Sequence, residues 1–350
     1  MNEKVQKTKK QILKINVHWQ KYWWRYTLGC FLVCFLLVAY SFRVIWWPEK
    51  SSEPIVVTEL PFRHPLTGEK TESEVTKPQV FGVMVENSAD AWPLAGVEDA
   101  FLVIEAPVES SIPRTIAFFY EGQVVEKIGP VRSARPYYLD WAAEFDALYA
   151  HCGGSPAALE LIKENGLWDL NEFWNGKYYW RSPSRLAPHN VYTSTELLSA
   201  AASSKEVSIQ DYSLWNFKDS LPVENPTDSD LILEEGLAYE TEWHYDQVSN
   251  SYVRWQGGVE VKSEDGDSIL ANNVAVIYTP ISVLDGIGRL ELETVGQGNA
   301  LVLQDGKKIT AVWKKESTND RLRFYAEDGK EISWNAGKTW IEVVSTNQEI

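Results

Sequence analysis

Residues 146–166 read DALYAHCGGSPAALELIKENG. The segment 146–152 is short and almost continuously apolar, which indicates a buried strand. Ser155 and Pro156 form the pattern of an N-cap followed by the first helical residue, and Gly166 is a typical helix stop. A strand that leads through Gly153-Gly154 directly into a helix predicts α/β architecture for this part of the chain.

The residues on either side extend this alternation of strands and helices. Apolar runs of strand length lie upstream, at 80–86, 100–106, 115–120 and 123–128. Residues 134–145 carry a helical apolar stripe with Ser133 as its N-cap, and Thr193 with Glu196 forms a capping-box pattern before a helix over 195–204. We therefore expect an α/β or α+β globular domain over residues 80–218.

The carboxy-terminal third has a different pattern. Residues 219–239 are rich in Pro, Asp and Asn, which is typical of a connector. Residues 240–346 contain short β-type runs with hairpin signals at Asp305-Gly306 and Asp328-Gly329. They predict an antiparallel β-rich subdomain, followed by a tail at 347–350. Because Cys152 is the only cysteine beyond residue 34, we expect packing and not an internal disulfide to stabilise these domains.

The amino terminus indicates a membrane anchor. Residues 26–47 read YTLGCFLVCFLLVAYSFRVIWW, an apolar run long enough to span a bilayer as one transmembrane helix. Residues 1–43 hold eight Lys or Arg against Glu3 alone. The positive-inside rule therefore predicts a cytoplasmic basic segment at 1–25, a cell-membrane location and an extracytoplasmic bulk. Residues 48–79, rich in Pro, Glu, Ser and Thr, predict a stalk.

Two alternatives to this anchor have weaker support in the sequence. A cleaved signal peptide needs a small-x-small cleavage site, and SFRVIWWPEK after the apolar run offers none. A lipid-modified cysteine would need to end the apolar run, whereas Cys30 lies near its start. We therefore expect the bilayer itself to be the first partner of this chain, bound through residues 26–47.

Charge excludes one class of ligand. The 350 residues carry a net charge of −16, although residues 1–43 are basic. The remainder is strongly acidic and would be repelled by a phosphate backbone, so we expect no nucleic-acid binding.

Several short segments together carry a resemblance to a known family. They are Pro65-Leu66-Thr67-Gly68, GVMVEN at 82–87, IGPVRSAR at 128–135, HCGGS at 151–155, HNVY at 189–192 and TWIE at 339–342. On these segments the chain resembles the YerB-like bacterial lipoprotein family, which has paired amino- and carboxy-terminal domains of unknown function. The resemblance spans about residues 61–346. It implies an extracytoplasmic location and brings no established activity. It also implies a lipid anchor, from which the apolar helix of this chain departs.

One polar constellation predicts ligand binding. The turn 153–155 and the segment 132–135 both lie at strand-to-helix transitions, where freed N–H groups and guanidiniums bind anions. If these turns share a sheet edge, they form a cationic pocket. Its candidate residues are Arg114, Arg132, Ser133, Arg135, His151, Gly153, Gly154, Ser155, His189 and Asn190. The alternative is structural: Arg132 or Arg135 pairs with Glu86, Glu105 or Asp140, and the turn is an ordinary helix cap.

Catalysis is a second hypothesis for the same residues. Ser155 would be the nucleophile, with His151 or His189 as base and Glu105 or Asp140 orienting it. Ser155 lacks the G-x-S-x-G context of a nucleophile elbow, and Cys152 next to His151 would face the opposite side of a strand. The five histidines lack metal-ligand spacing, so we expect no metal site and no cofactor.

The aromatic stretch 168–192 leaves two interpretations open. Its rings could stack on sugars, with Arg181 and Arg185 binding attached anionic groups, or they could pack a long loop onto the core. We predict a non-catalytic envelope module that binds an anionic glycan or peptide. The alternatives are a hydrolase or transferase acting on envelope polymers and a protein-interaction scaffold.

Overall fold

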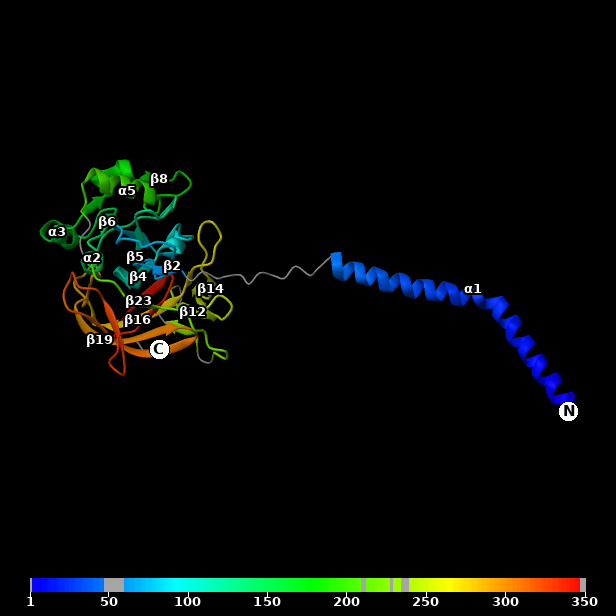
Figure 1. Ribbon diagram of the computed structural model, residues 1–350. Helices are drawn as coiled ribbons and strands as arrows, with labels where there is room; N and C mark the ends of the chain where they lie inside the picture. Colours follow the sequence, from blue (N-terminus) through cyan, green and yellow to red (C-terminus); the bar gives the residue numbers. More distant parts are fainter. Residues whose placement is uncertain (1, 47–59, 209–211, 227–228, 234–238, 347–350) are drawn as a thin grey trace. The chain divides into compact units, whose positions relative to one another are not determined.

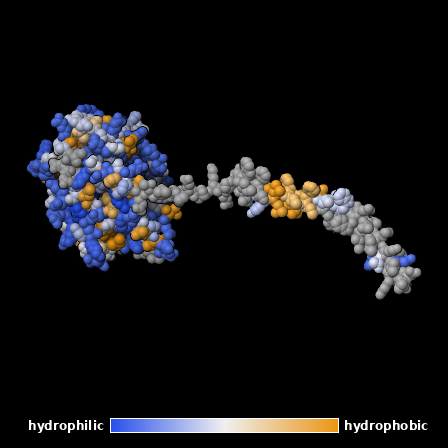
Figure 2. All heavy atoms as spheres, in the orientation of Figure 1, coloured by the Kyte–Doolittle hydropathy of each residue, from blue (hydrophilic) through white to orange (hydrophobic). Residues whose placement is uncertain are grey.

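The computed structural model describes residues 2–46, 60–208, 212–226, 229–233 and 239–346. The chain divides into two compact units, Met1–Glu59 and Leu60–Ile350. The first unit contains α1, Asn2–Trp46, a single helix that also covers most of the predicted basic segment. Within it, Lys21–Tyr40 is long and apolar enough to cross a membrane. Figure 2 shows this apolar stretch of α1, and a mostly hydrophilic face of the second unit.

The globular unit begins within the segment 48–79 that composition predicts to be a stalk. Residues 48–59 lie outside the described residues, but the second unit already begins at Leu60. Strand β1, Phe62–Arg63, pairs with β2, Lys70–Thr71, and Leu66 between them is buried in the core. Composition suggested a stalk over the whole of 48–79 because the segment is polar, whereas Leu66 supplies a buried anchor that ties it to the globular unit.

A ten-stranded sheet forms the centre of the second unit, as Figure 1 shows. Its strand order is β21-β20-β19-β16-β23-β4-β5-β3-β6-β7. The strands are β3 Val80–Glu86, β4 Leu102–Pro107, β5 Pro113–Tyr120, β6 Leu148–His151, β7 Asp169–Asn171, β16 Asn273–Thr279, β19 Gly296–Gln304, β20 Lys307–Lys315, β21 Arg323–Ala326 and β23 Thr339–Ser345.

This sheet contains strands from both sides of the predicted connector at 219–239. The last strand, β23, pairs in parallel with β4, with Leu102 opposite Thr339 and Glu105 opposite Glu342. It also pairs in parallel with β16 on its other side. The region 240–346 therefore combines antiparallel hairpins with one central parallel strand, and it shares its main sheet with the region 80–218. Sequence pattern could not show this, because it does not reveal which strands are neighbours.

Two cores cover the two faces of the sheet. Strand β16 shows the division, since Val274 and Val276 face one core and Ala275 and Ile277 face the other. Helices α2, Pro136–Ala143, and α3, Pro156–Glu164, pack on one face. The other face is covered by α5, Thr195–Ser204, and by a small sheet. That sheet contains β11 Leu231–Leu233, β12 Thr241–Asp246, β13 Ser251–Gln256, β14 Val259–Glu260 and β15 Leu270–Ala271.

Short elements complete the unit. They are α4 Glu172–Asn175, the hairpin of β8 Trp180–Arg181 with β9 Val191–Tyr192, the parallel pair of β10 Phe217–Lys218 with β22 Trp334–Asn335, and the hairpin of β17 Ile281–Val283 with β18 Leu290–Leu292.

Three local expectations are corrected by the structure. Residues 123–128 form no strand and contribute only an isolated bridge from Ile128 to Thr193. Helix α2 has Arg135 as its N-cap, and the Ser133 hydroxyl donates to the Cys152 carbonyl instead. Helix α5 is capped by Ser194, not by Thr193. At the two caps neighbouring polar residues compete for one role, and tertiary contacts decide which of them takes it.

Candidate functional site

The carboxyl ends of β3 and β6 and the segment 132–135 meet at one edge of the large sheet. Arg132 N–H donates to the Met84 carbonyl at 2.9 Å, and Cys152 N–H donates to the Arg132 carbonyl at 3.0 Å. An isolated bridge joins Ala134 to Gly154. The two strand-to-helix turns singled out in the sequence are therefore neighbours. They meet because residues 130–134 run beside β3 and the end of β6 and form an additional edge segment there.

Glu86 is the centre of the charges at this edge. Its carboxylate is 3% exposed and forms an ion pair with Arg132. Arg114 lies 4.0 Å from the same carboxylate, and His189 Nδ1 lies 3.3 Å from it. One carboxylate therefore faces two guanidiniums and an imidazole. Burial, with the nearby charge of Arg135, lowers the pKa of Arg114. The structural alternative for Arg132 is thus realised, yet a surplus positive charge remains at the cluster.

The two other arginines both donate to protein groups, although Nε of Arg114 is buried without a hydrogen-bond partner among the described residues. Arg135 donates to both carboxylate oxygens of Glu109, at 2.8 and 2.7 Å. Arg114 donates to the Ser133 carbonyl at 3.1 Å and its side chain is 5% exposed. Arg132 is the most accessible of the three, with 23% of its side chain exposed. The three guanidiniums therefore differ in role, and only Arg132 offers a surface for a ligand.

The glycine turn does not form the open anion cradle that the sequence predicts. Gly153 N–H donates to Asn171 Oδ1 at 3.1 Å, and Ser155 N–H donates to the Ala134 carbonyl at 3.2 Å. The Ser155 hydroxyl caps α3 by accepting from Ala158 N–H at 3.3 Å. The N–H groups of Gly153 and Ser155 that were expected to bind an anion are satisfied within the fold.

The histidines do not assemble a nucleophilic triad. His151 is fully buried, with Nδ1 at 2.7 Å from the Gly153 carbonyl and Nε2 at 2.8 Å from Asp169. His189 contacts Glu86, and no hydrogen bond joins either histidine to Ser155 within the described chain. Glu105 and Asp140 are engaged elsewhere, with Arg254 and Thr294. The geometry therefore does not support Ser155 as a nucleophile.

Cys152 is a neutral thiol at this edge. Burial raises its pKa, and the charge of Glu172 raises it further. The thiol donates to Glu172 Oε2 at 3.6 Å. A protonated thiol is a poor nucleophile and a poor metal ligand, so Cys152 acts here as a small polar contact.

The segment 172–192 makes several side-chain contacts at this edge. Arg181 donates to Glu172 Oε1 at 3.0 Å and to Asn190 Oδ1 at 3.1 Å. Glu172 accepts a hydrogen bond from the Cys152 thiol, and the Cys152 backbone N–H donates to the Arg132 carbonyl. His189 contacts the Glu86 carboxylate. We call the accessible residues Arg132, Arg181, His189 and Asn190 the arginine edge. Glu172, absent from the sequence-based set, follows β7 directly and is recognisable only from its contacts.

Comparison with known proteins places the chain in a family. A family described as a protein of unknown function, DUF3048, matches with its N-terminal domain at residues 66–208 and with its C-terminal domain at 235–341. The chain is 31% identical to "Putative lipoprotein YerB" of Bacillus subtilis over 332 residues, which covers 93% of this chain and 96% of the relative. The chain belongs to the DUF3048 family. The resemblance stated from the sequence is therefore confirmed.

A solved structure agrees with this assignment. The crystal structure of YerB from Bacillus subtilis superposes with a TM-score of 0.72 at 30% identity, covering 81% of this chain and 96% of that one. The whole arginine edge lies inside the DUF3048 N-terminal domain. Strands β16, β19, β20 and β21 of the central sheet and the start of β23 lie in the DUF3048 C-terminal domain.

The DUF3048 N-terminal domain also carries exposed aromatic rings, close in sequence to Glu172 and Arg181. Trp174 is 83% exposed and Phe173 is 62% exposed, and Trp180 is partly open. Tyr178 and Tyr179 are buried, as the packing interpretation expected. The buried tyrosines agree with the packing interpretation of the stretch 168–192, whereas stacking of its exposed rings on sugars stays a prediction. Arg185 donates to the carbonyls of Ala91 and Pro93, which makes it an anchor of the loop and not a ligand contact.

Proposed function

We propose that this DUF3048 protein is a membrane-anchored, extracytoplasmic module that binds a negatively charged sugar of the cell envelope at the arginine edge. The membrane location is supported by the apolar helix α1 and by the name of the relative YerB, a putative lipoprotein. The observation that carries the ligand class is the convergence of Arg114, Arg132 and His189 on the single carboxylate of Glu86.

Charge selects an anion at this site. Two guanidiniums against one carboxylate leave one unneutralised positive charge, in a chain whose overall charge is −16. Arg181 adds a second accessible guanidinium, with 45% of its side chain exposed. A guanidinium fork matches a carboxylate or phosphate by two parallel hydrogen bonds.

The exposed rings favour a sugar as the carrier of that anion. Trp174 and Trp180 are exposed and lie close in sequence to Glu172 and Arg181, so they offer flat apolar faces to solvent. Such faces are suited to the apolar side of a pyranose ring, while Asn190 supplies an amide for its hydroxyls.

The test uses the full-length protein in nanodiscs of zwitterionic lipid. Ligand-observed NMR titrations would compare N-acetylmuramic acid, glucose 6-phosphate and glucose. We expect both charged sugars to bind and glucose not to. Arg181→Gln should weaken binding severalfold without loss of thermal stability, and Arg132→Gln with Arg181→Gln should abolish it.

The matched control removes a similarly exposed ion pair at a distant place. Arg289 pairs with Asp285 at 2.7 Å in the region of the β17–β18 hairpin, and Arg289→Gln should leave binding unchanged. Equal binding of glucose and the charged sugars would refute the proposal, as would full binding by the Arg132→Gln, Arg181→Gln double variant.

A further inference from the structure

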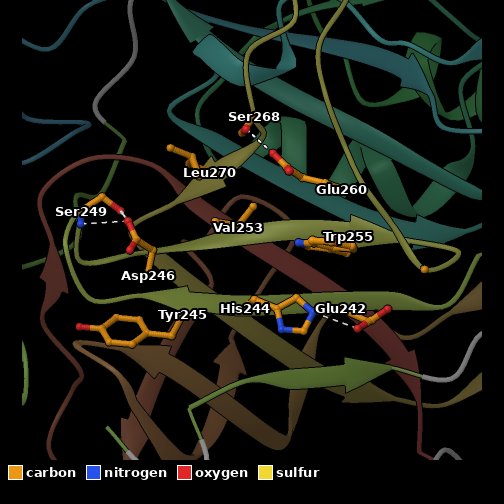
Figure 3. Close-up of a pocket in the computed structure, with 11 residues that line it drawn as sticks. Glu242, His244, Tyr245, Asp246, Ser249, Val253, Trp255, Glu260, Ser268 and Leu270 are labelled. Atoms are coloured by element: carbon orange, nitrogen blue, oxygen red, sulfur yellow. Dashed lines mark hydrogen bonds and ion pairs between the residues drawn. The ribbon is translucent and has the colours of Figure 1, made fainter. Parts of the chain in front are cut away.

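The small sheet presents an outward face that the arginine edge does not use. Along β12 and β13, alternate residues point in opposite directions. Trp243 and Tyr252 are buried in the core, whereas Glu242, His244, Val253 and Trp255 line a hollow of about 740 Å³ on the other side. Figure 3 shows these side chains along the two strands. We call this hollow the outer groove and define it by Glu242, His244, Asp246, Val253, Trp255 and Glu260.

The outer groove carries a strong excess of negative charge. Hydrogen bonds from Ser249 lower the pKa of Asp246, and the hydrogen bond from Ser268 lowers the pKa of Glu260, so both are ionised at neutral pH. No Lys or Arg is among the described residues that line the groove. Lys262 approaches Glu260 at 3.6 Å from outside, with 54% of its side chain exposed.

His244 is the only group in the groove that can carry positive charge, and it is already neutralised. Its Nδ1 lies 3.0 Å from Asp230 and its Nε2 lies 2.9 Å from Glu242. Burial opposes the charged imidazolium, but these two hydrogen bonds outweigh it and raise the pKa of His244. The charges of Asp246 and Glu260 therefore have hydrogen-bond donors but no cationic partner among the described residues that line the groove.

The strand register places an aromatic ring between two of the carboxylates. Trp255 is directly opposite Glu242 on β12 and directly opposite Glu260 on β14. A cation over the Trp255 ring would therefore have a carboxylate on each side, which combines cation–π attraction with ion pairing. Val253 pairs with both His244 and Leu270 and gives the middle of the groove an apolar floor.

A second anionic position lies further along the same face. Asp246 is four residues from Glu242 on β12, a separation of about 13 Å along a strand. Because the side-chain period of an extended chain is two residues, side chains at i and i+4 of an extended peptide point the same way across the same distance. The spacing of charges in the groove thus matches an extended chain.

We propose that the outer groove is a docking site for an extended cationic peptide segment of a partner protein. One Lys or Arg lies over Trp255 between Glu242 and Glu260, and a second, four residues away, pairs with Asp246. The aliphatic stems of these side chains cover Val253 and Leu270. The negative charge of the outer groove favours a cationic occupant, whereas the arginine edge is proposed to bind an anion.

The experiment measures fluorescence anisotropy of a labelled peptide with the full-length protein in nanodiscs of zwitterionic lipid, which does not attract cations. The probe is an uncharged Gly/Ser peptide with two lysines at i and i+4. Comparison peptides carry the lysines at i and i+1, or two glutamates. We expect the i and i+4 lysine peptide to bind most tightly and the glutamate peptide not to bind.

Variants locate the site. Glu242→Gln with Glu260→Gln should weaken binding about fivefold or more, because two ion pairs are lost. Asp246→Asn, at the carboxyl end of β12, should erase the preference for the i and i+4 spacing. Trp255→Phe should bind better than Trp255→Ala, because the smaller ring still offers a π face.

The control removes the same charge from another hollow. Glu126 and Glu196 line a separate surface hollow, and Glu126→Gln with Glu196→Gln should change the affinity by less than about twofold. If the control pair weakens binding as much as the groove pair, only net charge matters and the proposal is wrong. Equal binding of the two lysine spacings would overturn the extended-chain part of it.

Discussion

Arg254 of β13 donates to Glu105 of β4 at 2.6 Å, across 149 positions of sequence. The same guanidinium donates to Glu342 of β23 at 2.5 Å, and all three side chains are buried. One cation therefore faces two carboxylates where the two DUF3048 domains share their sheet. Burial, with the charge of Glu342, raises the pKa of Glu105 to about 7.

The buried carboxylates of Glu105 and Glu342 predict a pH dependence of the free energy of unfolding. The folded protein keeps a proton on Glu105 that the unfolded chain, with a pKa near 4.5, releases. The free energy of unfolding should therefore fall by roughly 1–3 kcal/mol as pH rises from about 5 to about 7. Urea unfolding followed by tryptophan fluorescence measures it. In Glu105→Gln that part of the pH slope should vanish, and an unchanged slope would assign it to other groups.

Removing one charge from a second buried cluster should cause a large loss of stability. Glu144 lies 3.1 Å from Lys315 and also forms an ion pair with Arg321, and all three are buried. Glu144→Gln removes the ion-pair partner of two buried cations, which should lower the free energy of unfolding by about 3–5 kcal/mol. Glu160→Gln, on the exposed side of α3, is the control and should change it by less than about 0.5 kcal/mol. Equal small effects would contradict the proposed importance of this cluster.

We expect substitution of Ser155, the N-cap of α3, to lower stability and to have no catalytic effect. Ser155→Ala removes the acceptor of Ala158 N–H and should cost about 1 kcal/mol of stability. Ser194→Ala removes the equivalent cap of α5, where the hydroxyl accepts from Leu197 N–H at 3.2 Å, and should cost about the same. Chemical denaturation compares them. A loss of ester hydrolysis on Ser155→Ala alone, with stability unchanged, would revive the nucleophile hypothesis.

Gly129 predicts a sharp intolerance of side chains in the segment that leads to Arg132. Its φ of +147° is strained for other residues, and a Cβ there would lie 2.8 Å from the Val191 carbonyl oxygen. Gly129→Ala should destabilise the protein by about 2–3 kcal/mol and weaken sugar binding at the arginine edge. Gly122→Ala, with a φ of +95° and open space around it, should cost about 1 kcal/mol and leave binding intact. Thermal unfolding and the sugar titration check both results.

Local signals predicted many elements well. The strand within 146–152 and the Ser155 cap of α3 were expected from an apolar run, a cap residue and an N1 proline, and the structure confirms them. Those signals depend on residues close together in the chain. The misplaced caps at Ser133 and Thr193 and the missing strand at 123–128 are failures of the same kind of signal, because two neighbouring polar residues or a short apolar run fit more than one local structure.

The candidate site was predicted only in outline. The proximity of segments 132–135 and 151–155 followed from two strand-to-helix turns, and Glu86 was already a candidate partner of Arg132. The engagement of Arg135 by Glu109 and of Arg181 by Glu172 and Asn190 could not be deduced, since these contacts depend on side-chain geometry. The outer groove was not predicted from the sequence. Its acidic residues lie on neighbouring strands, and sequence pattern alone does not show which face of each strand points away from the core.

By itself the sequence determined the apolar amino-terminal helix, the α/β pattern around residue 146 and membership of the DUF3048 family, because each of these depends on residue order or local periodicity. Tertiary structure alone decided that the final strand β23 inserts beside β4 and unites the two halves in one sheet. It also decided which arginines are neutralised and which face water. Ion pairs and strand neighbours are set by the positions of residues far apart in the chain, and free energy selects among them only when the whole core is assembled.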